Sequence, residues 1–407
     1  MTLADHIDDV LAPDLQGCND VDSHEMLPVH MWPEVFGEAG ERFVNTCSNM
    51  TIFDEAAENS LRRNDLSDDA GDINDDTVWS IRGPSAPSAI DLRRRAEVMD
   101  VMGVGKTLVF PTFALCGQIL VYNPIAHLIM GYDPDTVDRF EMGRAVIRAH
   151  NDWAIRTMRE LGDARVRPVG LLVSDTVEEL IADAEHLIDN GIKAIQLANG
   201  VPPAGLSPAH AALDPFWKLL SDANIPFTMH LGTESPLFAS NAWSEDVPLF
   251  AQSINSTAEF VLQPYWGATV HVATENFLTA MILGGVLERH PQLRVGSIEV
   301  GAQWVGPLAE RLDLWAHEFR RRYSGVLSLT PSQYMNRQVR ANPFHFEDVT
   351  MYFDRFTDLH DVYCFSTDYP HREGGYHAKQ TFRRKLAGFD DAVIRKFFIE
   401  NGELLLP

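Results

Sequence analysis

Short apolar runs alternate with longer amphipathic stretches along almost the whole chain. Eight runs could each form one buried strand: 18–21, 106–110, 167–173, 193–197, 226–230, 293–299, 338–343 and 361–367. Helix-like patterns lie between them at 91–101, 142–161, 177–190, 214–223, 276–289, 302–319 and 347–356. Strands that alternate with helices form parallel sheets with right-handed crossovers, and eight such units can close into a barrel. The pattern therefore predicts an α/β fold in which residues 1–407 form a single (β/α)8 TIM barrel.

Two stretches interrupt this repeat, and we expect them to be insertions after strands 1 and 5. Residues 54–77 contain nine acidic residues and few large apolar ones. This composition is typical of a solvated loop, with a substrate lid as the alternative. Residues 233–270 are rich in aromatic residues and proline. We expect them on the mouth side of the barrel, as a wall of the substrate pocket or as a subunit contact, and the sequence does not choose between these roles.

Charge and composition exclude several classes of partner. The net charge is −25 and the pI is near 4.9, so nucleic acids and anionic membranes would be repelled. No apolar run approaches the roughly 18 residues of a membrane span. The first residues carry acids and no basic region, which argues against a secretory signal. The four cysteines are scattered and form no CxxC pair, so we expect reduced thiols in a cytoplasmic protein: Cys18, Cys47, Cys116 and Cys364.

Acidic and imidazole side chains close four of the apolar runs. Asp22 and His24 end the first run, His230 the fifth, Glu299 the sixth and Asp368 the eighth. The carboxyl ends of barrel strands meet at one mouth, where active sites are built. Histidine, aspartate and glutamate side chains that meet at one point are common ligands of divalent metals. The sequence therefore predicts a site for one ion of zinc, manganese or iron, with two ions as the alternative.

Each of these residues also has an ordinary explanation. Asp22 and His24 are separated by one residue and share a strand face, where they could simply hydrogen-bond to each other. His230 could be a satisfied core histidine, and Asp368 could cap a helix or a tight turn. Glu299 is the most unusual, because a carboxylate that ends a buried strand must be paired, protonated or bound to metal. The metal prediction depends on the five positions taken together.

Further histidines lie near the predicted mouth. His371 follows Asp368 by three residues, His271 stands just before a predicted helix, and His345 follows the seventh strand. His271 and His345 could equally be ordinary surface or capping residues. We expect His271, His371 and Glu299 to act as acid–base groups. His290 lies before a strand, at the end of the barrel associated with stability rather than chemistry.

Six short segments give the chain a family resemblance: VDSH at 21–24, RPVGLL at 167–172, GGVLERHP at 284–291, EVGAQW at 299–304, PSQY at 331–334 and STDYPH at 366–371. With these segments, nearly the whole chain resembles the amidohydrolase superfamily. The resemblance is to its amidohydrolase-2 branch, which includes aminocarboxymuconate-semialdehyde decarboxylase and the resorcylate and carboxyvanillate decarboxylases.

The resemblance implies a set of metal ligands. The family's His-x-His on the first strand falls on Asp22 and His24, so one imidazole is replaced by a carboxylate. The histidine of the fifth strand falls on His230 and the aspartate of the eighth on Asp368. The histidine of the sixth strand, a base or oxyanion partner in several decarboxylases, falls on Glu299. An ionised carboxylate can serve as a base or a ligand, but it cannot stabilise a developing anion.

The leading hypothesis is a metal-dependent decarboxylase or hydrolase that acts on a small organic acid. One alternative is a dinuclear iron or manganese oxygenase on the same fold, since the candidate ligands outnumber the needs of one ion. Another alternative is a non-catalytic partner subunit of a hetero-oligomer. We expect a homo-oligomer, with a hetero-oligomer formed with a paralogue as the second possibility.

Overall fold

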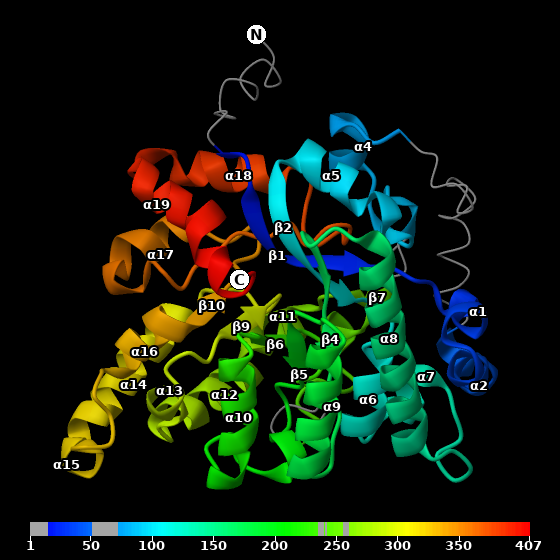
Figure 1. The fold of residues 1–407 in the computed structure, drawn as a ribbon, viewed down its shortest axis with the longest axis horizontal. Coiled ribbons are helices and arrows are strands. Elements are labelled where there is room, and N and C mark those ends of the chain that lie inside the picture. The colour runs from blue at the N-terminus through cyan, green and yellow to red at the C-terminus, as the bar shows by residue number, and fades with distance from the viewer. Residues whose placement is uncertain (1–14, 51–71, 235–239, 241, 255–259) are drawn as a thin grey trace.

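Extended segments lie side by side in the centre of the molecule, and helices surround them (Figure 1). The computed structural model describes residues 15–50, 72–234, 240, 242–254 and 260–407. A three-stranded parallel sheet contains β1 (Cys18–Glu25), β2 (Val104–Pro111) and β3 (Val166–Pro168). A five-stranded parallel sheet contains β4 (Gly170–Leu171), β5 (Ile195–Leu197), β6 (Phe227–His230), β9 (Val295–Ile298) and β10 (Val339–Ala341).

The two sheets are continuous through the segment that contains β3 and β4. Val169, the residue between these strands, donates its N–H to the carbonyl of Val109 on β2, at 3.0 Å. Gly170 donates to the carbonyl of Ala194, just before β5, also at 3.0 Å. One short segment therefore pairs with a neighbour on each side and joins the strands of both sheets in sequence order.

The eighth segment closes the ring, although it is less regular than the predicted strand 361–367. It meets its neighbours through isolated parallel bridges, Ala341 with Tyr363 and Ser23 with Tyr369. The backbone N–H and the hydroxyl of Thr367 both donate to the carboxylate of Asp20, at 2.9 and 2.6 Å. Backbone bonds still join the segment to both neighbours, for example from the N–H of Asp368 to the carbonyl of Asp22 at 2.7 Å, but the N–H of Thr367 is bound by a side chain instead of the ladder. The predicted barrel is confirmed, with this correction to its last strand.

The predicted helices form the outer layer. They are α5 (Arg95–Met102), α8 (Arg139–Leu161), α9 (Val177–Asp189), α10 (Asp214–Asp222), α12 (His271–Leu283), α13 (Val286–Arg289), α14 (Val305–Glu318) and α17 (Val349–Arg355). The single helix predicted over 276–289 is two helices, because Gly285 has a positive φ of 73° and interrupts the turn. It also begins earlier than predicted, at His271.

Several short helices were not predicted. They are α1 (Trp32–Phe36), α2 (Glu38–Thr46), α4 (Asp75–Ser80), α6 (Cys116–Tyr122), α7 (Ala126–Met130), α11 (Pro264–Thr269), α15 (Arg320–Tyr323), α16 (Pro331–Gln338), α18 (Ala378–Lys385) and α19 (Asp391–Arg395). Most have eight residues or fewer, too few for the helical period of apolar residues to stand out.

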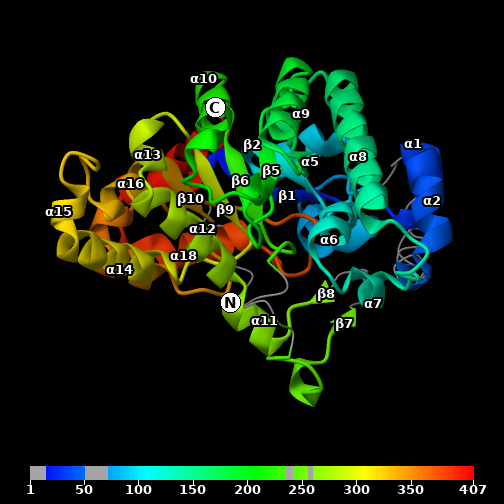
Figure 2. The same cartoon turned by 90° about the horizontal axis from the view of Figure 1, so that it is seen from below.

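The two interruptions of the repeat differ in what the structure describes. Of the acidic stretch 54–77, residues 54–71 lie outside the described residues, and the remainder leads into α4 through a capping box formed by Asn74 and Thr77. The stretch 233–270 contains α11 and an antiparallel pair, β7 (Ser253–Ile254) and β8 (Phe260–Val261). These elements project from the barrel on one side (Figure 2).

Apolar side chains fill the barrel from one end. The residues of this inner cluster come from the strand segments and from the last turn of the chain, and none has exposed surface. They are Val21, Leu108, Phe110, Val169, Ala194, Ile298, Cys364, Leu405 and Leu406. All four cysteines are buried and unpaired. Among the described residues, no helix combines the length and apolar character needed to cross a membrane. The apolar filling leaves the carboxyl ends of the strands as the place for polar groups.

Candidate metal centre

Six buried side chains with metal-binding atoms converge at the carboxyl ends of the strands. Each is between 0 and 6% exposed. Their ligand atoms form two overlapping groups of four, and within each group the atoms all lie within 4.8 Å of one another. Both groups contain His24 and Glu299. We call the whole set the mouth cluster: Asp22, His24, His230, Glu299, Asp368 and His371.

The first group surrounds the Oδ1 atom of Asp22. This oxygen lies 3.3 Å from Nε2 of His24 and 3.5 Å from Nε2 of His230. Oε2 of Glu299 lies 3.2 Å from Nε2 of His230 and 3.7 Å from Nε2 of His24. Two imidazoles and two carboxylates from β1, β6 and the end of β9 therefore face a common point.

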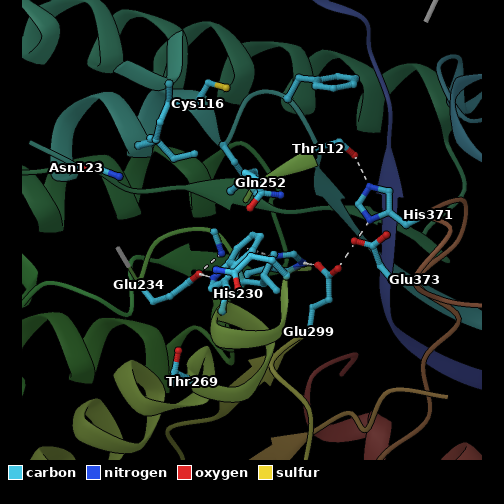
Figure 3. A pocket seen from close by; sticks show the side chains of 18 of the residues that line it. Thr112, Cys116, Asn123, His230, Glu234, Gln252, Thr269, Glu299, His371 and Glu373 are labelled. Atoms are coloured by element: carbon cyan, nitrogen blue, oxygen red, sulfur yellow. Dashed lines mark hydrogen bonds and ion pairs between the residues drawn. The ribbon is translucent and has the colours of Figure 1, made fainter. Parts of the chain in front are cut away.

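The second group extends from His24 toward the eighth segment. Oδ1 of Asp368 lies 3.4 Å from Nε2 of His24 and 3.1 Å from Nδ1 of His371. The rings of His24 and His371 are stacked, with centroids 3.8 Å apart. Nε2 of His371 contacts the hydroxyl of Thr112 at 2.9 Å. Figure 3 shows His371 between Thr112 and the Glu299 side of the cluster.

Local backbone geometry aims these side chains inward. Asp22 and His24 lie on β1 with one residue between them, so both point to the same face. Glu299 and Asp368 follow the ends of their segments in the left-handed region, with φ of 57° and 50°. Few residues other than glycine adopt this conformation, and it is concentrated at functional sites. It turns the chain sharply where the two carboxylates must reach the mouth.

Asn342, which is not among the predicted site residues, positions two of the acids. Its Nδ2 donates to Oδ2 of Asp22 at 3.0 Å and to the hydroxyl of Ser366 at 2.7 Å. Its Oδ1 accepts the backbone N–H of Glu299 at 3.0 Å. Asn342 is the last residue but one of the predicted strand 338–343, so a search for polar residues near strand ends could have found it as well.

Protonation states in the first group suit metal binding. Burial alone would raise the pKa of Asp22, but the imidazoles of His230 and His24 that face it hold this pKa below its usual range. Burial, helped by the nearby His371, lowers the pKa of His24 well below its usual value. Both shifts favour the carboxylate form of Asp22 and the neutral imidazole of His24. These are the forms in which both side chains bind metal ions.

A divalent cation fits the atoms that remain without hydrogen-bond partners. Oδ1 of Asp22, Nε2 of His24 and Nε2 of His230 are buried and accept or donate no hydrogen bond. Buried polar atoms are rarely left in this state, because their desolvation is unfavourable. All three belong to the first group of four, and carboxylate and imidazole donors suit zinc, manganese and iron. Asp22, His24, His230 and Glu299 could hold the ion.

A cavity of about 370 Å³ opens beside the mouth cluster. Four cluster members line it: His24, His230, Glu299 and His371. Most of its remaining wall is apolar and includes Met50, Phe113, Leu115, Ile119, Ile129 and Leu231. The stretch 233–270 contributes Tyr265, Trp266 and several polar residues to the same wall. A subunit contact through this stretch stays a prediction.

Two histidines considered from the sequence are not brought into the cluster. His271 is the first residue of α12, and its Nε2 lies 3.3 Å from Oε1 of Glu275, one helical turn away. It is not among the residues that line the cavity. Nδ1 of His345 contacts the backbone carbonyl of Glu373 at 3.0 Å. Because α12 begins at His271, the side chain of His271 lies on a helix face rather than on a loop at the mouth.

The sequence profile of a family described as Amidohydrolase matches residues 126–407. The comparison with curated proteins returned no match. Among solved structures, an amidohydrolase from Mycobacterium avium subsp. paratuberculosis K-10 is 22% identical, with a TM-score of 0.61, over 79% of this chain and 75% of that one.

Two decarboxylases share the fold over more of the chain. One is 5-carboxyvanillate decarboxylase from Novosphingobium aromaticivorans DSM 12444, solved with manganese and 4-hydroxy-3-methoxy-5-nitrobenzoic acid. It is 15% identical over 97% of both chains, with a TM-score of 0.56. The other is 2,6-dihydroxybenzoate decarboxylase from Rhizobium, 15% identical over 96% of this chain and 98% of that one, with a TM-score of 0.55. At these identities the likeness establishes a common fold.

Proposed function

The chain belongs to the amidohydrolase family, and from this premise we propose that it is a metal-dependent enzyme that removes carbon dioxide from a small organic acid. One observation carries the proposal. The mouth cluster lies at one side of a cavity whose other walls are mostly apolar. Such a cavity can hold the flat, apolar part of an acid while its carboxylate faces the cluster.

Manganese is the ion we propose first, with zinc and iron as alternatives. Asp22, His24, His230 and Glu299 would hold it, because their ligand atoms already lie together and three of them lack hydrogen-bond partners. A bound divalent ion polarises a substrate oxygen and draws negative charge away from the reacting carbon. Manganese is also the ion in the solved 5-carboxyvanillate decarboxylase.

Asp368 and His371 would handle the proton. Nδ1 of His371 faces Oδ1 of Asp368 at 3.1 Å, and its Nε2 contacts the hydroxyl of Thr112. The contact with Thr112 and the stacking on His24 fix the orientation of this imidazole, and an imidazole can take up or release a proton near neutral pH. When the bond to the carboxylate breaks, its electron pair remains on the substrate carbon. That carbon takes the proton from His371, and carbon dioxide leaves.

The apolar wall favours decarboxylation over hydrolysis. Loss of carbon dioxide turns a charged carboxylate into a neutral product, and exclusion of water from an apolar pocket assists that change. The solved relatives that bind benzoates point to the same class of substrate, an aromatic carboxylic acid.

The test is a search for released carbon dioxide. The manganese-loaded protein is incubated with hydroxylated benzoates that carry ¹³C in the carboxylate, and the gas is measured by mass spectrometry. We expect one ¹³CO₂ for each molecule of decarboxylated product, and none after the metal is removed by chelation. Cleavage of amide or ester analogues by a protein that releases no carbon dioxide would assign it to the hydrolases instead.

A dinuclear iron or manganese oxygenase is the second candidate. The observation that favours it is the pair of overlapping groups of four donors, which share His24 and Glu299. A bridging carboxylate could hold two ions about 3.5–4 Å apart. Metal analysis of the purified protein distinguishes the candidates. Two ions per chain, reduced to one by Glu299→Gln, would support the dinuclear site, and one ion in both proteins would exclude it.

A further inference from the structure

Glu234 is a buried carboxylate in the wall of the cavity, and the proposed reaction does not use it. The residue is 2% exposed and lines the same cavity as His230 and Glu299. In Figure 3, Glu234 and Glu299 lie on opposite sides of His230. A carboxylate on the side away from Glu299 is therefore available to a ligand that reaches across the cavity.

Neutral donors hold both oxygens of Glu234. Oε1 accepts the indole N–H of Trp266 at 2.5 Å, and Oε2 accepts the backbone N–H of Gly232 at 2.8 Å. None of the ion pairs among the described residues includes Glu234. Burial raises the pKa of Glu234, because the hydrogen bonds it accepts offset its desolvation only in part. A carboxylate offers about four acceptor sites, so these two bonds leave acceptor capacity unused. Burial without a cation is unfavourable unless a further donor compensates for it.

Contacts with the loop that follows β5 fix residues 232–234. The hydroxyl of Thr233 donates to Oδ1 of Asn199 at 2.9 Å and accepts the backbone N–H of Asn199 at 3.1 Å. A Cβ on Gly200 would lie 2.4 Å from the carbonyl oxygen of Thr233 and 2.8 Å from Cα of Glu234. The loops after β5 and β6 are thus in close backbone contact. The carboxylate is preorganised, which reduces the entropy lost when a ligand binds.

We propose that Glu234 selects substrates that carry a hydrogen-bond donor, a hydroxyl or amino group, on the part of the molecule away from the reacting carboxylate. The proposal rests on the proposed function, because it takes the substrate carboxylate to face the mouth cluster. The apolar wall holds the ring and offers little to distinguish one ring from another. Glu234 supplies a buried carboxylate contact, and a site built to hydrogen-bond a donor strongly rejects analogues that lack it.

Binding to the manganese-loaded protein tests this selection. Isothermal titration measures the dissociation constants of benzoate, of 3- and 4-hydroxybenzoate, and of their methyl and methoxy counterparts. In the wild type, at least one hydroxybenzoate should bind about 10- to 100-fold more tightly than its methyl counterpart, the range expected for a hydrogen bond to a charged group. Glu234→Gln should abolish the preference. Glu373→Gln, the same charge change at a half-buried position of the same wall, should retain it.

The outcomes separate this inference from the proposed function. If none of the benzoates binds, both are overturned. If benzoates bind but the hydroxyl preference is absent, or survives in Glu234→Gln, only the role of Glu234 is overturned. Tighter binding of a methoxy compound than of its hydroxy counterpart also overturns the role of Glu234. A methoxy oxygen only accepts hydrogen bonds, so Glu234 would then be a protonated donor. Should Glu234→Gln not fold, Glu234→Asp withdraws the carboxylate by one methylene and must weaken the preference.

Discussion

Histidine and carboxylate side chains cluster at both ends of the barrel strands, and the two clusters are neutralised differently. At the amino ends, the carboxylate of Asp214 accepts hydrogen bonds from Arg289 at 2.9 Å and from His290 at 3.0 Å. These three side chains, the amino-end cluster, are 10–38% exposed. At the other end, Asp22 has no exposed surface and faces two imidazoles and one amide.

The difference shows which cluster can neutralise its charges without an added ion. Arg289 brings a permanent positive charge to the amino-end cluster, and solvent screens the remaining charge because the cluster is partly exposed. In the mouth cluster, Asp22 and two imidazoles keep buried atoms without hydrogen-bond partners. A cluster of the first kind stabilises the fold slightly. A cluster of the second kind lowers stability until a cation joins it, which is the property expected of a metal site.

The strongest test of this contrast is Asp368→Ala. We expect turnover to fall by more than about 100-fold, since even groups outside the ligand set typically change metal affinity or activity by about 10- to 100-fold. The core of the barrel does not include this side chain, so circular dichroism and the unfolding temperature should stay close to those of the wild type. Activity above about a tenth of the wild-type value would remove Asp368 from the site.

Metal content compares the two clusters directly. His230→Ala removes a donor from the mouth cluster, and the purified variant should lose most of its metal. His290→Ala changes the amino-end cluster and should retain the wild-type metal content. Elemental analysis after dialysis measures both. Equal losses in the two variants would show that the clusters do not differ as we argue.

Asn342→Ala should have a smaller effect. The amide orients Asp22 and the backbone of Glu299, so its loss should weaken metal binding by about 10-fold, near the lower end of the range for groups that support ligands. Asn336→Ala is the matched control, because Asn336 makes two hydrogen bonds of similar length to Asp361. The measurement is a competitive titration with a chromogenic chelator. Equal metal affinities in the two variants would contradict the prediction.

The smallest effect is expected for Asp214→Asn, which should reduce stability at pH 7 by about 0.2–1 kcal/mol, the usual range for an exposed ion pair. Hydrogen bonds from Arg289 and His290 outweigh partial burial and lower the pKa of Asp214 in the folded state. The carboxylate therefore stabilises the fold above its unfolded-state pKa of about 3.9, and this contribution disappears as the pH falls further. Urea unfolding at pH 7 and pH 3 should show the two proteins converging at the lower pH. A constant gap would exclude the ion-pair explanation.

Barrel architecture and most of the mouth cluster could be predicted because both follow from local patterns. Each strand needs only a short apolar run, and each site residue stands at the end of one. Asn342 also lies near a strand end, but its role depends on contacts with Asp22 and with the backbone of Glu299, which local patterns do not contain. The irregular eighth segment could not be foreseen, since it depends on the bonds between Asp20 and Thr367, which lie 347 residues apart.

Glu234 and His271 illustrate what local patterns do not contain. Glu234 stands in a polar stretch, and its burial depends on Trp266, 32 residues further along the chain. His271 was expected near the mouth from its place after the insertion. The exact start of a helix decides where such a side chain points, and helix ends are poorly defined by sequence. Both positions are set by how segments pack rather than by the residues beside them.

The left-handed backbone at Glu299 and Asp368 also limits how this site can evolve. A residue other than glycine, asparagine or aspartate loses roughly 1–2 kcal/mol in that conformation, and β-branched residues lose more. Selection at Asp368 can therefore exchange aspartate for asparagine or glycine without strain, whereas at Glu299 the glutamate itself is held against its backbone preference. Substitution of Glu299 by glycine or asparagine would relax the strained backbone and would remove the carboxylate at the same time. A mutant library that seeks new chemistry here must be screened for reaction, because screening for stability alone would select against the carboxylate.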